Sequence, residues 1–139
     1  MSGRGANGAA YGVNARGQVA GTAESRNADP ACPAPQKNQF KPVLWHGAEV
    51  TELPTVGGDR NGIAYSINDN GDAVGASGAC AEFNQNLGLL LQSKHALLWE
   101  AGRVTDIGNL GGKGQIMGHF AHTINNNREV VGYSDITGD

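Results

Sequence analysis

One fourteen-residue pattern occurs three times in this chain of 139 residues. It reads AYGVNARGQVAGTA from residue 10, AYSINDNGDAVGAS from residue 64 and AHTINNNREVVGYS from residue 121. The first two copies begin 54 residues apart. A second pattern occurs twice at that offset, as PVLWHGAEVTELPTVGG from residue 42 and ALLWEAGRVTDIGNLGG from residue 96. Two patterns that keep one offset across a divergent stretch indicate stacked copies of one small unit. The recurring positions include Asn14, Gly21, Trp45, Asn68, Gly75, Trp99, Asn125 and Gly132.

The first pattern predicts a β-hairpin in every copy. Tyr65 and Ile67 alternate with smaller residues, which is the period of two expected for a strand. Asn70-Gly71 then predicts a two-residue turn in which both residues have positive φ. The third copy has Asn127-Arg128 at this place, and asparagine tolerates the left-handed conformation better than most residues. We therefore expect Asn127 to adopt it.

The second pattern predicts another hairpin. Its runs PVLWH and HALLW are continuously apolar, as in strands buried on both faces, and each leads through a glycine-containing turn into a further strand. Two hairpins per repeat make a four-stranded antiparallel unit, which is typical of a β-propeller blade. The predicted fold is therefore all-β: one repeat domain over residues 1–139 that forms about two and a half blades of a propeller. Repeat one covers about 9–58, repeat two about 63–112 and a half repeat about 119–134.

The small number of predicted blades indicates which partners the chain would meet. Propellers typically close with about four to eight blades, so a smaller number leaves faces and an edge uncovered. We expect these surfaces to meet missing blades of a longer chain, or another copy of this chain through self-association.

The motifs resemble a known family. AYSINDNGDAVGAS, HALLWEAGRVTDIGNLGG and AHTINNNREVVGYS are similar to the HAF-type repeat of probable extracellular bacterial proteins. The family is named for a His-Ala-Phe triplet, which here reads His95-Ala96-Leu97, whereas the first copy has Lys41-Pro42-Val43. The resemblance implies a propeller-like repeat protein that is secreted or displayed at the cell surface. It implies no activity.

Composition excludes several classes of partner. A formal net charge of −3 and a pI near 5.7 give no basic surface for nucleic acid. The longest apolar run, LGLLLQ at residues 87–92, is far too short to cross a bilayer. The first twelve residues lack the apolar segment of a secretory signal peptide.

The sequence predicts no cofactor, metal or catalytic residue. Residues 68–72 read NDNGD, but the other copies lack its set of oxygen ligands, so we interpret it as a hairpin turn and not as a calcium loop. His119 and His122 are three residues apart and would point to opposite faces of a strand, so they do not suit a shared zinc ion. His122 takes the place of Tyr11 and Tyr65, which we interpret as a core position. No serine stands in a G-x-S-x-G motif.

Two residue pairs are candidates for structural roles. Trp45 and Trp99 stand at matching positions in matching apolar strands, which favours core packing over ligand binding. Cys32 and Cys80 lie in the two stretches that do not repeat, and they could form one disulfide or stay as two free thiols.

The non-repeating stretches carry the functional hypothesis. They read ESRNADPACPAPQKNQFK at residues 24–41 and GACAEFNQNLGLLLQSK at residues 78–94, and specificity commonly resides in loops on a rigid scaffold. We therefore expect a non-catalytic extracellular repeat module that uses these loops for recognition or assembly, with an unknown ligand. The alternative is a fragment of a secreted propeller enzyme that acts on polysaccharide, and a spacer without a ligand is a third reading.

Overall fold

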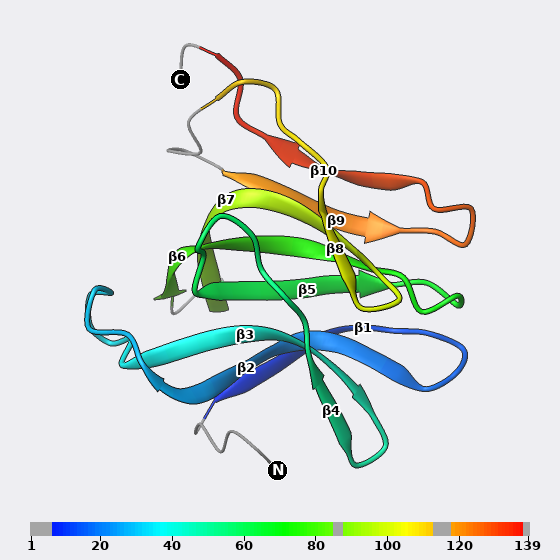
Figure 1. Ribbon diagram of the computed structural model, residues 1–139, viewed down its shortest axis with the longest axis horizontal. Coiled ribbons are helices and arrows are strands. Elements are labelled where there is room, and N and C mark those ends of the chain that lie inside the picture. The colour runs from blue at the N-terminus through cyan, green and yellow to red at the C-terminus, as the bar shows by residue number, and fades with distance from the viewer. Residues whose placement is uncertain (1–6, 85–87, 113–117, 138–139) are drawn as a thin grey trace.

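The protein is an all-β stack of three antiparallel sheets (Figure 1). The structure is a computed structural model that describes residues 7–84, 88–112 and 118–137, and these residues contain no helix and hence none that could span a membrane. The first sheet has the order β1-β2-β3-β4, the second β5-β6-β7-β8, and the third pairs β9 with β10. The strands are β1 (Gly8–Val13), β2 (Gln18–Ala28), β3 (Asn38–His46), β4 (Glu49–Glu52), β5 (Asn61–Ile67), β6 (Ala73–Asn84), β7 (Gly88–Glu100), β8 (Arg103–Asp106), β9 (His119–Ile124) and β10 (Val130–Ser134).

Each copy of the repeat builds one sheet. The predicted four-stranded antiparallel unit is confirmed for the first two copies, and the half repeat forms a single hairpin. The three sheets lie one above another from the N-terminal to the C-terminal end, with β1, β5 and β9 along the same edge of their sheets (Figure 1). Consecutive copies of the repeat therefore form consecutive sheets of the stack.

One row of apolar residues fills the space between the first two sheets. The cross-strand neighbours Ile67, Ala73 and Trp99 are buried, and Val104 continues the row on β8. The row packs against the first sheet and the segment that follows it, in one cluster with Ala20, Leu44, Leu53 and Val56. The same row of the third sheet, Ile124 and Val130, packs against Val74, Ala96 and Leu98 of the second.

The corresponding row of the first sheet faces outward. Its cross-strand neighbours are Val13, Val19, Trp45 and Val50, each 54 residues before its buried or partly buried counterpart. Val13 is 68% exposed, and Trp45 is half-buried, whereas Trp99 is 2% exposed. The two indoles thus share a backbone position but not an environment, because among the described residues another sheet covers this face of the second sheet but not of the first.

The three asparagine turns close the hairpins at one side of the stack. We call residues 14–18, 68–72 and 125–129 the Asn turns. In the second, Asn68 Oδ1 accepts hydrogen bonds from the amides of Asn70 and Asp72, at 3.1 and 2.9 Å, while Gly71 N–H donates to the Asn68 carbonyl. The other two turns repeat these bonds. This is a three-residue loop with one left-handed residue.

The expected two-residue turn, with positive φ at both residues, is therefore wrong. Only Gly71 has positive φ in the second turn, at 87°, and Asn70 does not. In the third turn the left-handed residue is Arg128, at φ 63°, and the prediction that Asn127 would adopt this conformation is wrong. The asparagine at the start of the turn binds two amides and fixes which later residue must be left-handed, whatever its type.

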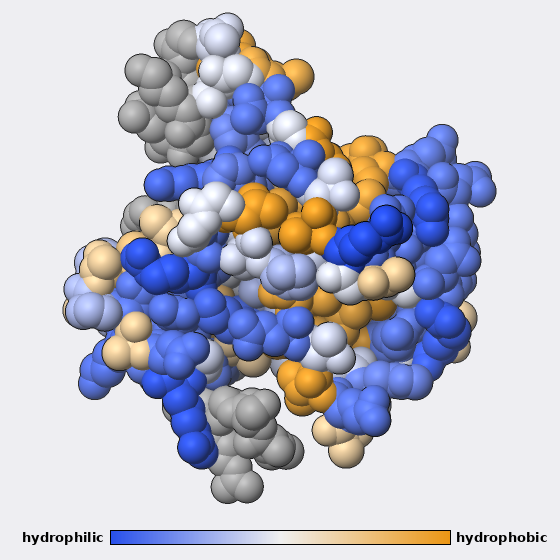
Figure 2. All heavy atoms as spheres, in the orientation of Figure 1, coloured by the Kyte–Doolittle hydropathy of each residue, from blue (hydrophilic) through white to orange (hydrophobic). Residues whose placement is uncertain are grey.

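The turns also bind one another along the stack. Asn14 Nδ2 donates to the Asn68 carbonyl at 2.9 Å, and Asn68 Nδ2 donates to the Asn125 carbonyl at 3.0 Å. The next backbone amide in each turn also donates to the following turn, Ala15 N–H to Asp69 Oδ1 and Asp69 N–H to Asn126 Oδ1. Hydrophilic residues cover this side of the molecule (Figure 2). The repeated asparagines therefore serve both the turn and the stacking of sheets.

A bulge explains the repeated glycine. The pairing of β1 with β2 shifts between Ala10 and Gly12, and the other two copies shift at the same place. A Cβ at Gly21, Gly75 or Gly132 would collide with the backbone carbonyl of the facing strand. Only glycine therefore fits opposite the bulge.

The bulge also turns one side chain per copy toward the edge of the stack. These residues are Tyr11, Tyr65 and His122, whose ring centroids are 5.3 Å apart for the first pair and 5.8 Å for the second. Tyr11 is 42% exposed and His122 is exposed, so the interpretation of this position as core is wrong for both. His119, in contrast, is buried, with its Nδ1 3.0 Å from Ser134 Oγ.

Candidate functional site

The two non-repeating segments meet at the side of the stack opposite the Asn turns (Figure 1). The first is a loop over residues 29–37, because β2 continues to Ala28 and β3 begins at Asn38. The second is not a loop as expected. Strands β6 and β7 lengthen to 12 and 13 residues and remain paired from Ala81–Leu91 to Asn84–Gly88. Residues 85–87, which join them, lie outside the described residues.

A disulfide joins the loop to this long hairpin. Cys32 and Cys80 are bonded, with their Cα atoms 5.5 Å apart, and are buried. The bond closes a separation of 48 residues and links the first repeat to the second. In the chain-entropy description such a closure stabilises the folded state by about 4 kcal/mol. The loop is therefore fixed to the neighbouring sheet by a covalent bond.

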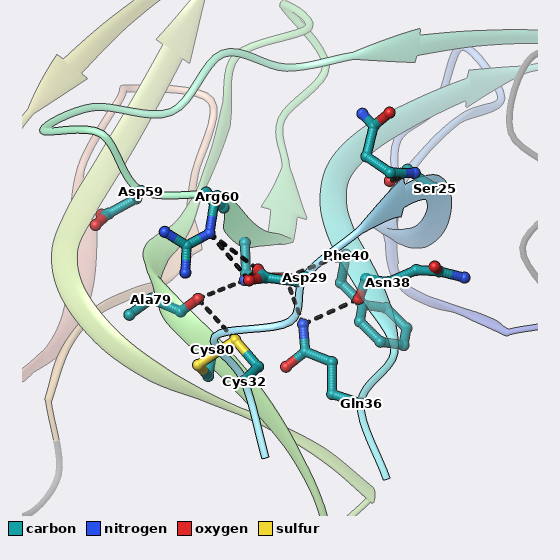
Figure 3. A network of polar contacts seen from close by, with 12 residues as sticks. Ser25, Asp29, Cys32, Gln36, Asn38, Phe40, Asp59, Arg60, Ala79 and Cys80 are labelled. Atoms are coloured by element: carbon teal, nitrogen blue, oxygen red, sulfur yellow. Dashed lines mark hydrogen bonds and ion pairs between the residues drawn. A yellow bond between two sulfur atoms is a disulfide. The ribbon is translucent and has the colours of Figure 1, made fainter. Parts of the chain in front are cut away.

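Asn61 is the hub of a buried polar network beneath the loop, and Figure 3 labels its partners Asp29, Gln36, Phe40 and Ala79. This residue begins β5 and is fully buried. Its Nδ2 donates to Asp29 Oδ2 at 3.1 Å and to the Ala79 carbonyl at 2.5 Å. Its Oδ1 accepts from Phe40 N–H at 2.7 Å and from Gln36 Nε2 at 2.9 Å. One side chain thus connects both ends of the loop to the strands of two sheets.

Asp29 places a carboxylate in the same network. Arg60 Nε lies 3.1 Å from both carboxylate oxygens, and the Asp29 side chain is 1% exposed. Desolvation acts to raise the pKa of Asp29, but hydrogen bonds from Arg60 and Asn61 and the positive charge of Arg60 outweigh it and lower the pKa below its ordinary value. The carboxylate therefore stays ionised at neutral pH and holds the loop to the start of β5.

The outer surface of the loop is apolar and restrained. Pro30, Pro33 and Pro35 are exposed, as is Lys37. Backbone hydrogen bonds close the loop from Asp29 N–H to the Lys37 carbonyl at 2.9 Å and within it from Gln36 N–H to the Pro33 carbonyl at 3.2 Å. Prolines that are already held in one conformation lose little freedom on binding a partner. This surface can therefore offer apolar contact at a low entropic cost.

A serine and a histidine of the second sheet also meet an aspartate of the segment that precedes β5. Asp59 Oδ2 accepts a hydrogen bond from Ser77 Oγ at 2.6 Å and lies 2.6 Å from His95 Nδ1. Nucleophilic catalysis needs a serine that is accessible and bonded to its base. Ser77 is fully buried and donates to the aspartate, so this arrangement has the connectivity of a structural contact.

The structure separates the repeated positions from this site. Asn14, Asn68 and Asn125 lie in the Asn turns on the opposite side, and the glycines and Trp99 serve packing. Among the predicted residues, the site contains Cys32 and Cys80. Asp29, Gln36 and Asn61 were missed. The only signal for Asp29 and Gln36 was that they fall in the non-repeating stretch.

Within the described residues, no three histidine, cysteine or acidic side chains gather in a way that could hold a metal ion. Comparisons of the chain with family models, with curated proteins and with solved structures found no match in any of the three. The resemblance to HAF-type repeats therefore depends on the sequence motifs alone.

Proposed function

We propose that the chain is a non-catalytic repeat module that recognises its ligand with the loop at residues 29–37 and the adjoining end of the β6–β7 hairpin. One observation carries the proposal. The non-repeating loop is fixed by the Cys32–Cys80 disulfide and the network around Asn61, yet it leaves three prolines and a lysine exposed. The loop therefore presents these exposed side chains in a fixed arrangement.

The proposed architecture is about two and a half blades of a β-propeller. Two features support it: consecutive four-stranded sheets stack face to face in chain order, and β1, β5 and β9 occupy the same edge of their sheets. The resemblance to HAF-type repeats fits the same proposal. In this reading β1, β5 and β9 are the inner strands, and the row of Tyr11, Tyr65 and His122 lies beside the central channel.

The proposed compartment is extracellular or the cell surface. The disulfide supports it, because such bonds persist in oxidising environments and are rare in the cytosol. The sequence resemblance points to the same compartment.

A polysaccharide panel tests recognition and catalysis together. The full chain is passed over immobilised xylan, pectin and chitin and over extracted bacterial cell wall, and release of reducing ends is measured in the same samples. The matched variants are Pro33→Ser/Pro35→Ser in the loop and Val131→Ser, an exposed position on β10. Circular dichroism and thiol titration establish that each variant folds with its disulfide.

We expect one polymer to retain the wild type and Val131→Ser, to bind the loop variant at least about tenfold more weakly, and to stay uncleaved. Equal retention of all three proteins would contradict recognition by the loop. Release of reducing ends would contradict the non-catalytic assignment. Retention by no member of the panel would contradict recognition of these polysaccharides by the loop.

A further inference from the structure

The face of the second sheet that contains Trp99 holds a segment of the chain that ends in a turn, which the Asp59 N–H closes by donating to the Val56 carbonyl at 3.0 Å. We call residues 53–59, Leu-Pro-Thr-Val-Gly-Gly-Asp, the connector, because they join the first sheet to the second. Trp99 Nε1 donates to the Pro54 carbonyl at 2.7 Å. Leu53 is buried and Val56 is partly buried in the cluster that contains Trp99. At the end of the connector, Asp59 is bound by Ser77 and His95. Apolar, indole and carboxylate contacts together hold the segment.

The first sheet repeats this face without a connector on it among the described residues. A cavity of about 420 Å³ is lined by Trp45, Val43, Val50 and Lys41, which correspond to Trp99, Leu97, Val104 and His95. Val50 is 43% exposed, and Trp45 is half-buried. Apolar surface is visible near this end of the stack in Figure 2. We call this cavity the Trp45 groove.

The charges around the Trp45 groove also match the occupied face. Lys41 and Arg26 line it and supply positive charge where His95 contacts Asp59 in the second sheet, and Lys41 Nζ also donates to the Arg60 carbonyl at 2.8 Å. Glu24 contributes a negative charge to the same lining. Glu52 lines it too and corresponds to Asp106, whose Oδ2 lies 4.0 Å from His95 Nε2 in the occupied face. An incoming carboxylate would therefore meet a basic group in an arrangement like that of Asp59.

Residues 1–6 do not have the chemistry of the connector. The repeat offset aligns Met-Ser-Gly-Arg-Gly-Ala at residues 1–6 with Thr-Val-Gly-Gly-Asp-Arg at residues 55–60. Serine replaces the valine, and glycine replaces the aspartate. These six residues therefore lack the valine and the carboxylate with which the connector contacts its face.

We infer that the Trp45 groove binds a peptide segment of the connector type, with an apolar residue, a proline and a second apolar residue followed by a Gly-Gly-Asp turn. The indole N–H of Trp45 donates to the carbonyl of the proline, the two apolar side chains cover Val43 and Val50, and the carboxylate pairs with Lys41 or Arg26. This surface lies apart from the loop at residues 29–37, and its test does not depend on the ligand of that loop.

The probe is a capped peptide with the sequence of residues 52–60, Glu-Leu-Pro-Thr-Val-Gly-Gly-Asp-Arg, titrated into the full chain labelled with nitrogen-15. The chain has two tryptophans and therefore two indole N–H signals, which Trp45→Phe assigns while leaving the ring packing largely in place. We expect saturable movement of the Trp45 indole signal at millimolar peptide and none of the Trp99 signal.

Matched variants test each contact. Trp45→Ala should weaken binding at least about tenfold, and so should a peptide with serine in place of leucine and valine. Tyr133→Ser, exposed on the third sheet, serves as the folded control and should bind as the wild type does. Equal binding by Trp45→Ala, or no movement of the Trp45 signal at millimolar peptide, would overturn the inference. A Trp45 signal that moves on concentrating the chain alone would overturn it in favour of a second copy as the occupant.

Discussion

Arg128 shows how strongly the turn constrains a single residue. It adopts φ 63°, the conformation that Gly17 and Gly71 hold in the other two Asn turns. Its guanidinium lies 2.8 Å from Asp72 Oδ2, so an ion pair to the neighbouring turn accompanies the unfavourable backbone. The hydrogen bond and charge of Asp72 raise the pKa of Arg128, which stays charged at all ordinary pH values. The third copy thus replaces the freedom of glycine with a contact between sheets.

Variants with glycine and with alanine at position 128 should therefore differ in stability. Both Arg128→Gly and Arg128→Ala remove the guanidinium, but only alanine keeps the strain of a side chain at positive φ. We expect Arg128→Gly to be more stable by about 1 kcal/mol in urea unfolding. At position 127, where φ is not positive, the same pair should show no advantage for glycine. Equal stability of the two variants at position 128 would show that the turn relaxes.

The error at Asn127 has a physical origin. The prediction for Asn127 was transferred from the second copy, where Asn70 is followed by Gly71. An Asn-Gly pair suits both a two-residue turn and the end of a longer loop. The choice depends on Asn68, which lies two residues earlier and binds the amides of Asn70 and Asp72. The recurrence of that asparagine was visible in the sequence, but its hydrogen bonds were not. Turn type was therefore less predictable than turn position.

At the scale of elements, the loop at residues 29–37 should respond to acid through Asp29. Folding lowers the pKa of this carboxyl from 3.8. Its contribution to stability is therefore present above that value and is lost as the pH falls through the lower pKa of the folded state. Asp29→Asn should cost about 1–3 kcal/mol at neutral pH because it leaves Arg60 without its partner.

Urea unfolding at several pH values checks this prediction. The difference in unfolding free energy between wild type and Asp29→Asn should shrink as the pH falls below about 4. Glu49→Gln, at an exposed position on β4, is the control and should change stability little at any pH. A difference that stays constant from neutral to acidic pH would show that the carboxylate charge is not what holds the loop.

The long β6–β7 hairpin shows what the repeat could not predict. The stretch at residues 78–94 was interpreted as a loop because it has no counterpart elsewhere in the chain. It forms paired strands instead, with register shifts after Ser77 and Gly78. Lack of repetition shows that a segment is particular to one copy, but it carries no information about its backbone. Strand content was predictable only where two copies could be compared.

At the scale of the whole molecule, the two tryptophans report on the stacking of sheets. Trp99→Ala should cost about 3–5 kcal/mol, because the indole is buried between two sheets and its removal leaves a cavity. Trp45→Ala should cost only about 1–2 kcal/mol, because half-buried surface contributes less. Thermal and urea unfolding measure both values. Equal losses would mean that the face of the first sheet is covered in solution.

Counterparts in the repeat also explain most of the exposed apolar residues. Ile107 and Leu110 are 43% and 67% exposed, whereas Leu53, the counterpart of Ile107, is 5% exposed, and Val56, the counterpart of Leu110, is partly buried. Val131 is 64% exposed, although Ala20 and Val74 at the same position are fully buried. The sequence could predict these equivalences from the offset alone. It could not show which copy lacks a neighbour, because that depends on the order in which the sheets stack.

The hydrogen bonds between the Asn turns give the stack a polarity. Each repeated asparagine amide points toward the following copy, from Asn14 to Asn68 and from Asn68 to Asn125. Two molecules related by a twofold axis on this side would bring donors against donors or acceptors against acceptors. Any assembly that continues these hydrogen bonds from molecule to molecule must therefore be head-to-tail. The third Asn turn of one molecule would then meet the first Asn turn of the next.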